Sequence, residues 1–299
     1  MSQVHVNGVD LYYEETGEGT PLVFVHEFAG ESASWHLQVR HFARRYRCIT
    51  YNARGYPPSD VPTNPRAYSQ DHAVSDLLGL LDALEVERAH ICGLSMGGYA
   101  ALHFGIRHPA RARSLVVAGV GYGSGTADRA AYEHDITVTA ERFTDEGMAV
   151  MADIYTRGPT RVQFIDKDPL GWQEFRSQFA MQSAVGHALT LRGVQLTRPT
   201  IFELEAEMVA LTVPTLIVVG DEDEPCLDPA LFMKRKIHSA GLVMLPRTGH
   251  TINLEEPEAF NHAVEGFLTA VDQGRWRMRN PASLGDSQIL PTEHADRGT

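Results

Sequence analysis

The stretch RAHICGLSMGGYAALHFGIRHP, residues 88–109, joins a short apolar strand to a helix across one serine, Ser95. The residues before Ser95 are typical of the end of a buried strand, and from Met96 onward apolar residues recur with helical spacing. Gly93 and Gly97 flank the serine at two positions on either side. Glycines at these places let the strand and the helix approach each other without clashes between Cβ atoms. The stretch therefore predicts a sharp strand-to-helix turn centred on Ser95.

Such a turn holds its central residue in strained backbone geometry. It lifts the Ser95 hydroxyl above the carboxyl end of a sheet, at a helix N-terminus whose free N–H groups favour negative charge. This is the G-x-S-x-G pattern of a nucleophile elbow. The motif also occurs by chance, so it indicates a catalytic serine only where a base, an acid and an oxyanion hole accompany it.

Composition limits the classes of partner. The chain has 299 residues, of which 43% are hydrophobic, enough for one large core with an insertion. Its formal net charge of −12 argues against binding to nucleic acids or anionic membranes. The N-terminal residues 1–17 lack the pattern of an export signal, and apolar runs such as 213–220 are too short to span a bilayer. We expect no nucleic-acid or membrane partner and a small-molecule substrate, and we leave a homo-oligomer open.

The three cysteines, Cys48, Cys92 and Cys226, cannot all pair with one another. They show none of the close spacings typical of metal ligands. We therefore expect a reduced, cytoplasmic protein without a metal or a cofactor.

Strand and helix patterns alternate along most of the chain. A hairpin is predicted at residues 4–6 and 11–15, with Asn7-Gly8 as its turn. Alternation of this kind predicts a mostly parallel, doubly wound α/β sheet with helices on both faces. The further elements expected are strands at 21–26, 46–51, 113–119, 213–220 and 241–245, and helices at 34–44, 70–84, 228–239 and 256–271.

Residues 122–211 interrupt this alternation with helical sequence rich in aromatic residues and methionine. Most of these side chains are expected to form a small core of their own, but the insertion follows the carboxyl end of a strand, where α/β sheets bind ligands. We predict a helical lid over Ser95. The remaining core would comprise residues 1–121 and 212–272, and the aperiodic residues 273–299 would form a mobile or surface-draped tail.

His250 is the candidate base among the 14 histidines. It lies in a glycine-containing loop directly after the last predicted strand, and therefore on the same sheet edge as Ser95. For the acid, residues 221–224 (Asp-Glu-Asp-Glu) follow the strand 213–220. Most of these carboxylates are expected in solvent, with one turned toward His250 to orient its ring. The oxyanion hole would take one N–H group from Met96 and another from the loop at residues 26–30.

With these motifs in this order, the chain resembles the α/β-hydrolase superfamily over about residues 9–271. The resemblance is to its lidded branch of carboxylesterases, enol-lactonases, cofactor-free haloperoxidases and carbon–carbon bond hydrolases. It implies that Ser95 is the nucleophile, His250 the base and Asp223 the acid. It also implies that the backbone N–H groups of Phe28 and Met96 form the oxyanion hole.

The resemblance implies cleavage of a small-molecule carboxylic ester through an acyl-enzyme. One alternative is hydrolysis of a carbon–carbon bond in a dienoic ketone by the same triad. Perhydrolysis is expected to be secondary, and an alternative of another class is a ligand-binding receptor on a hydrolase scaffold. The serine at the elbow excludes the epoxide-hydrolase and dehalogenase branches, which need aspartate there.

One departure from the family pattern is Glu27, which follows His26 where the family usually has glycine. A carboxylate facing the oxyanion would oppose the developing negative charge. We therefore expect the Glu27 side chain to point away from the site, with Arg54 as its nearest cation.

Overall fold

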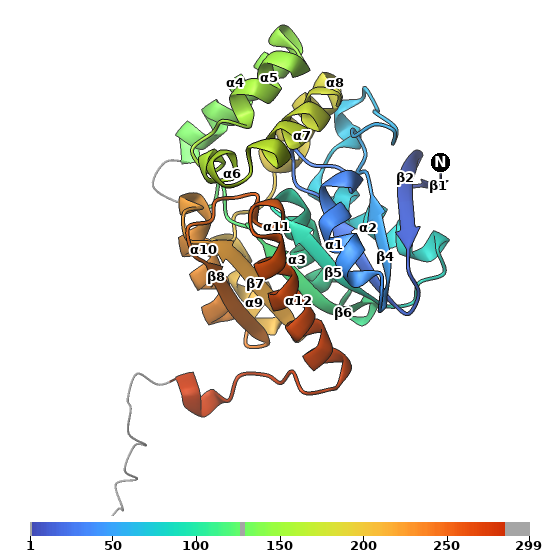
Figure 1. Ribbon diagram of the computed structural model, residues 1–299, viewed down its shortest axis with the longest axis vertical. Helices are drawn as coiled ribbons and strands as arrows, with labels where there is room; N and C mark the ends of the chain where they lie inside the picture. Colours follow the sequence, from blue (N-terminus) through green and yellow to red (C-terminus); the bar gives the residue numbers. More distant parts are fainter. Residues whose placement is uncertain (1, 126–128, 285–299) are drawn as a thin grey trace, which may run out of the picture.

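The computed structural model describes residues 2–125 and 129–284, which form an α/β structure around one sheet (Figure 1). The strands are β1 (Ser2–Val6), β2 (Val9–Thr16), β3 (Thr20–Val25), β4 (Tyr46–Tyr51), β5 (Ala89–Leu94), β6 (Ala112–Ala118), β7 (Thr215–Gly220) and β8 (Ala240–Leu245). The helices are α1 (His36–Phe42), α2 (Gln70–Ala83), α3 (Met96–Arg107), α4 (Arg129–Glu146), α5 (Met148–Tyr155), α6 (Val162–Lys167), α7 (Pro169–Ala180), α8 (Ala184–Thr190), α9 (Glu205–Ala210), α10 (Glu224–Lys236), α11 (Ile252–Glu255) and α12 (Pro257–Asp272).

The sheet has the strand order β1-β2-β4-β3-β5-β6-β7-β8. Strands β3 to β8 run parallel, and the β1–β2 hairpin adds to β4 in antiparallel fashion. Asn7 and Gly8 both have positive φ, 48° and 78°, as a two-residue hairpin turn requires. The predicted fold class is confirmed, and β5, which leads into Ser95, lies inside the sheet between β3 and β6.

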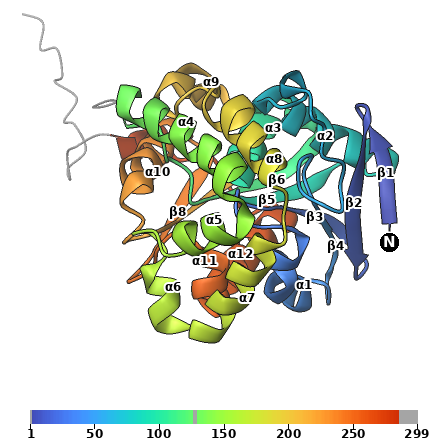
Figure 2. The ribbon, with the colours of Figure 1, turned by 90° about the horizontal axis from the view of Figure 1, so that it is seen from above.

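Helices cover both faces of the sheet (Figure 2). Helices α1, α11 and α12 pack on one face around residues such as Phe42 and Phe260. Helices α2, α3, α9 and α10 pack on the other around residues such as Leu77 and Met233. Among the described residues, no helix combines the length and the apolar character that a membrane span requires.

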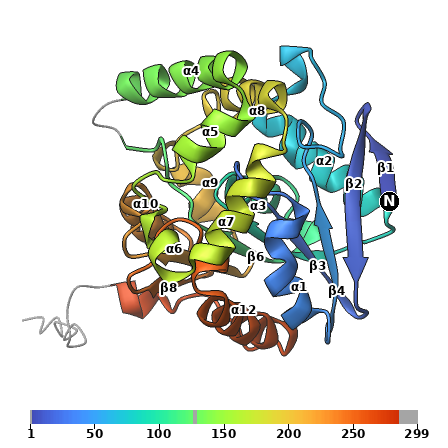
Figure 3. The same cartoon turned by 45° about the horizontal axis from the view of Figure 1, so that its top comes forward.

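Helices α4 to α8 lie between β6 and β7 in the chain and stand above the sheet (Figures 1 and 3). Their buried aromatic side chains share one core cluster with Phe28 and Met96, which flank the carboxyl ends of β3 and β5. Helix α9 differs, because its Met208 packs in the core on the face of the sheet that α2, α3 and α10 also cover. The division of the chain at residues 122 and 211 stays a prediction.

Helix α10 and the chain after α12 add two details to the elements that the sequence predicts. Helix α10 begins at Glu224, four residues before the predicted start, because Pro225 in its first turn suits a helix beginning. After α12 the chain runs back along the sheet edge, where the Trp276 indole donates to the Ser239 carbonyl at 2.8 Å and packs on Phe267. The first part of the predicted tail is thus draped on the surface, and residues 285–299 lie outside the described residues.

We predict that Gly97→Ala destabilises the protein strongly, whereas Gly266→Ala does not. A Cβ at Gly97 would lie 2.0 Å from the Val25 carbonyl oxygen, and backbone on that side cannot yield. Gly266 lies inside α12, where an added methyl group would have no neighbour within 4 Å. Overpacking at Gly97 should lower the free energy of unfolding by roughly 3 kcal/mol, and Ala at 266 should raise it by about 0.5–1 kcal/mol. Urea unfolding followed by circular dichroism measures both, and equal stabilities would contradict the prediction.

Candidate functional site: a serine, histidine and aspartate under the lid

Ser95 occupies the turn between β5 and α3 with φ 54° and ψ −113°. A non-glycine residue with positive φ is strained, and its surroundings must hold it there. The Ser95 N–H donates to the Ala118 carbonyl of β6 at 2.8 Å. A Cβ at Gly93 would lie 2.1 Å from the Gly97 carbonyl oxygen, so only glycine fits. The turn therefore has the close backbone approach that the glycine spacing predicts.

His250 and Asp223 form a buried pair. The His250 Nδ1 lies 2.7 Å from Asp223 Oδ2, and the two residues are 6% and 1% exposed. Asp223 precedes α10 at the N-cap position, yet its carboxylate faces His250 instead of the helix N–H groups. In the same loop Glu222 and Glu224 are exposed, and Asp221 accepts from the Thr248 N–H. Of the four acidic residues, Asp223 is therefore the one that reaches the histidine.

His250 and Asp223 each change the pKa of the other. Burial by itself lowers the pKa of His250, but the charge and hydrogen bond of Asp223 outweigh burial and raise this pKa above 6.5. Burial by itself raises the pKa of Asp223, but His250 outweighs it and the pKa falls below 3.8. Asp223 thus holds its negative charge beside an imidazole that gains basicity, the combination a general base needs.

The loop that carries His250 is held from two sides. The Glu255 carboxylate of α11 accepts from the N–H groups of Gly249 and Thr251 at 2.9 and 3.0 Å. The His250 N–H donates to the Thr160 carbonyl, in the loop between α5 and α6, at 2.7 Å. Sequence reasoning missed both supports, although Glu255 lies only five residues after His250. The lid thereby contacts the histidine backbone directly.

The two expected oxyanion donors lie in the core cluster that the lid closes. Within the part of the chain that the structure describes, neither the Phe28 N–H nor the Met96 N–H has a hydrogen-bond partner. Both residues are nearly fully buried, at 1% and 7% exposure. Buried N–H groups are normally paired, so these two, which follow the carboxyl ends of β3 and β5, are candidates for binding a ligand oxygen.

A cavity of about 470 Å³ connects these elements. Such a volume suits a small-molecule ligand. Its lining joins Ser95, Asp223 and His250 to the lid residues Tyr155 and Arg161. The serine and the His–Asp pair, which are far apart in the sequence, therefore share one space under the lid.

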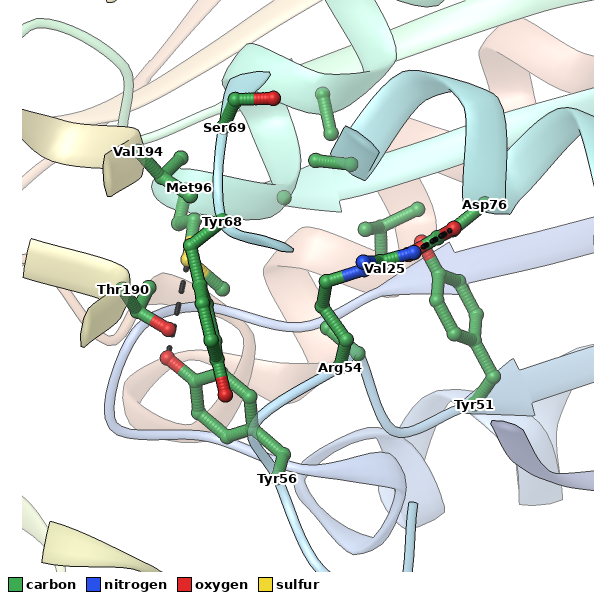
Figure 4. A pocket seen from close by; sticks show the side chains of 14 residues that line it. Val25, Tyr51, Arg54, Tyr56, Tyr68, Ser69, Asp76, Met96, Thr190 and Val194 are labelled. Atoms are coloured by element: carbon green, nitrogen blue, oxygen red, sulfur yellow. Dashed lines mark hydrogen bonds and ion pairs between the residues drawn. The ribbon is translucent and has the colours of Figure 1, made fainter. Parts of the chain in front are cut away.

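The expectation that Arg54 is the nearest cation to Glu27 is wrong, although Glu27 is not among the residues that line the cavity of Ser95 and His250. Its side chain is 2% exposed and lies under the lid, where Arg161 Nη2 approaches Glu27 Oε2 at 2.5 Å. Arg54 instead makes two bonds to Asp76 of α2, at 2.6 and 2.7 Å, and Figure 4 shows it pointing toward Asp76. The sequence could not indicate the pairing of Glu27 with Arg161, because Arg161 is 134 positions away and belongs to the insertion.

A second, much smaller cavity lies behind Met96, between Tyr56, Tyr68 and Arg54 (Figure 4). Its volume is about 30 Å³, which leaves room for a water molecule or two but not for a substrate. The Tyr56 hydroxyl points toward the Met96 sulfur at 3.8 Å. This cavity therefore adds no second ligand site.

Two further lid side chains contact the loop after β3. The ring of His187 lies 3.0 Å from the Phe28 carbonyl through Nε2 and 2.8 Å from the Ser183 carbonyl through Nδ1. Gln182 donates to the Gly30 carbonyl at 3.2 Å. His187 is fully buried among aromatic rings, and burial lowers its pKa to about 4. A helical histidine is expected at the surface by default, so the sequence did not single it out.

Asp223, Cys226 and His250 also bring three potential metal ligands within 4.8 Å of one another. However, Asp223 and His250 approach to the 2.7 Å of a hydrogen bond. Two ligands of one tetrahedral zinc ion at its usual bond lengths would stand roughly 3.3 Å or more apart. The trio is thus better described as a hydrogen-bonded pair with a buried thiol beside it.

Comparison with known proteins agrees with this geometry. Residues 20–145 match the family model described as alpha/beta hydrolase fold. The chain is 29% identical to 3-oxoadipate enol-lactonase 1 of Acinetobacter baylyi, over 91% of this chain and 100% of that protein. It is 27% identical to 2-hydroxymuconate semialdehyde hydrolase of a Pseudomonas species, over 89% of this chain and 92% of that protein. The solved structure of the enol-lactonase from Burkholderia xenovorans superimposes with a TM-score of 0.79 at 25% identity. The superposition covers 90% of this chain and 100% of that one.

We predict that Asp223→Asn lowers kcat far more than Asp221→Asn. Only the Asp223 carboxylate contacts the His250 ring, and an amide there would favour the wrong tautomer. The expected loss is about 10⁴-fold, the scale known for the orienting carboxylate of a serine triad. Steady-state kinetics on a shared ester substrate measures it, and Asp221→Asn serves as the matched control from the same loop. A larger loss in the control would assign the acid to Asp221.

We further predict that kcat/KM rises with pH through one ionisation whose midpoint lies above 6.5. His250 must be neutral to accept a proton, and its pKa is raised by Asp223. Activity should therefore be lost as the pH falls through this value and the imidazole becomes charged. A pH–rate profile of the free enzyme measures the midpoint, and full activity maintained at pH 4 would rule out a histidine base.

Proposed function

Because the chain belongs to the α/β-hydrolase superfamily, we propose that it hydrolyses a small-molecule carboxylic ester, cyclic esters included, through a Ser95 acyl-enzyme. The observation that carries the proposal is the 2.7 Å bond between His250 and Asp223, which lie with Ser95 on one cavity. Hydrolytic activity is also supported by the enol-lactonases, since a lactone is an ester.

The proposed reaction assigns each residue one role. His250 accepts the Ser95 proton as the hydroxyl attacks the ester carbonyl, and Asp223 stabilises the imidazolium that forms. The N–H groups of Phe28 and Met96 hold the oxyanion, at about 3–4 kcal/mol for a donor. His250 then gives the proton to the leaving alcohol and activates the water that releases the acid.

Carbon–carbon bond hydrolysis is the second candidate, and one specific observation favours it. The 2-hydroxymuconate semialdehyde hydrolase is similar to this chain over nearly its full length. The same serine, base and oxyanion hole would act on a ketone in place of an ester. Parallel assays of p-nitrophenyl esters of rising chain length and of dienoic ketones separate the two reactions.

We predict that Ser95→Ala abolishes hydrolysis and labelling by a fluorophosphonate while the fold persists. Removing the nucleophile should lower kcat by roughly 10³-fold or more, as in other serine hydrolases. Mass spectrometry of the labelled wild-type protein should place the adduct on Ser95, and circular dichroism checks the variant. Retention of a tenth of the wild-type kcat would show that another residue is the nucleophile.

Tight ligand binding without turnover, in a protein whose Ser95 is labelled, would favour the receptor alternative over catalysis.

A further inference from the structure

Glu27 and Arg161 form a buried ion pair between the loop after β3 and the loop between α5 and α6. Glu27 directly precedes Phe28, the expected oxyanion donor. Arg161 directly follows Thr160, whose carbonyl accepts from the His250 N–H at 2.7 Å. The Arg161 guanidinium also lies over the Tyr155 ring, 4.5 Å from its centroid, and lines the cavity that Ser95 and His250 share. The pair therefore stands next to both parts of the catalytic machinery.

Its hydrogen bonding differs from that of a pair built only to hold the fold. Arg54 uses two nitrogens and both carboxylate oxygens of Asp76, and such two-bond pairing is the strong arrangement. Arg161 makes one bond to Glu27. Among the residues that the structure describes, Glu27 Oε1 and Arg161 Nε are buried without a partner. Unpaired buried polar atoms are costly, so stability alone gives a poor account of this pair.

We propose that Glu27 and Arg161 are positioning residues whose opposite charges balance each other beside His250, so that the lid docks against the histidine loop without biasing its protonation. The proposal rests on the proposed function, in which His250 is the general base. Arginine keeps its charge in proteins. A lid that brings Arg161 to the site therefore needs a nearby anion if the imidazolium is to form during the reaction.

The charges around His250 support this role. Arg161 acts to lower the pKa of His250 and Glu27 acts to raise it, in addition to the larger effects of burial and Asp223. Glu255 of α11 is also coupled electrostatically to His250. The remaining titratable groups near the ring or on the cavity wall are Cys226, Tyr122, Tyr155, Glu222 and Glu224. Lys167 lies 3.9 Å from Glu255, so that carboxylate has a cation of its own. Arg161 and Glu27 are the two opposite charges that act on the pKa of His250 besides Asp223.

The test compares Glu27→Gln, Arg161→Gln and the double variant with the wild-type protein. Glu27→Gln leaves Arg161 uncompensated and should lower the midpoint of the kcat/KM profile by about one pH unit. Arg161→Gln should raise the midpoint, and the double variant should return to within about 0.3 units of wild type. Opposite shifts that cancel are expected of balanced charges, whereas a structural latch would lower stability without moving the midpoint.

Asp76→Asn is the matched control, because it breaks the other buried arginine pair. It should lower the free energy of unfolding and leave the midpoint where it is. The proposal is overturned if Glu27→Gln and Arg161→Gln shift the midpoint in the same direction, or if neither shifts it by more than about 0.2 units. If Glu27→Gln does not fold, Arg161→Gln and Arg161→Lys test the proposal instead. Arg161→Gln removes the positive charge and should raise the midpoint, whereas Arg161→Lys keeps the charge and should not.

A second readout separates this proposal from the proposed function. The His250 ring can be titrated by NMR with ¹³C-labelled histidine, its signal assigned by its loss in His250→Asn. This titration needs no turnover and should show the same opposite shifts. If the variants show no turnover but shift the NMR titration of His250 in opposite directions, the proposed hydrolase function alone is overturned. If Ser95-dependent turnover is present but the NMR titration does not shift, the charge-balance proposal alone is overturned.

Discussion

The position of Ser95 depends on the close approach of three backbone segments: the end of β3, the end of β5 and the first turn of α3. Gly97 lets α3 begin against the Val25 carbonyl, and Gly93 lets the strand meet the same helix turn. With any larger residue at either position the helix would move away from the sheet, and Ser95 would leave its positive-φ conformation. The two proposed oxyanion donors adjoin the same contact, because Phe28 follows β3 and Met96 opens α3. One steric constraint thus fixes Ser95 in its turn and sets where α3 begins against the end of β3.

Charge balance is the second constraint, because the site buries several ionisable groups. Asp223 pairs with His250 and Glu27 pairs with Arg161. Glu255 accepts from two backbone N–H groups and lies 3.9 Å from Lys167. His26 needs no charged partner, since its ring nitrogens lie 2.7 and 3.0 Å from the Glu27 carbonyl and the Ala53 N–H, and burial lowers its pKa to about 4. A carboxylate next to the proposed oxyanion donor Phe28 is therefore tolerable when a cation from the lid pairs with it.

Local patterns were enough to predict much of the fold and the order of the site residues. Apolar periodicity and turn residues located strands such as 46–51 to the residue, and the glycines around Ser95 implied the elbow. The contacts of side chains brought in by the insertion could not be predicted in this way. The sequence predicts Arg54 as the partner of Glu27, because both follow neighbouring strands, but Arg54 makes two hydrogen bonds to Asp76 on α2 instead. Only the three-dimensional position of the α5–α6 loop shows that Arg161 is the partner.

The lid is therefore part of the site's framework as well as its cover. Arg161, Gln182 and His187 all bind the five-residue loop at 26–30, and Thr160 binds the His250 backbone. A movement of the lid away from the sheet would break contacts to the loop at 26–30 and to the backbone of His250 at the same time. It would also remove Arg161 from Glu27 and leave that buried carboxylate without its cation. Docking of the lid and the support of these two loops therefore depend on the same few side chains.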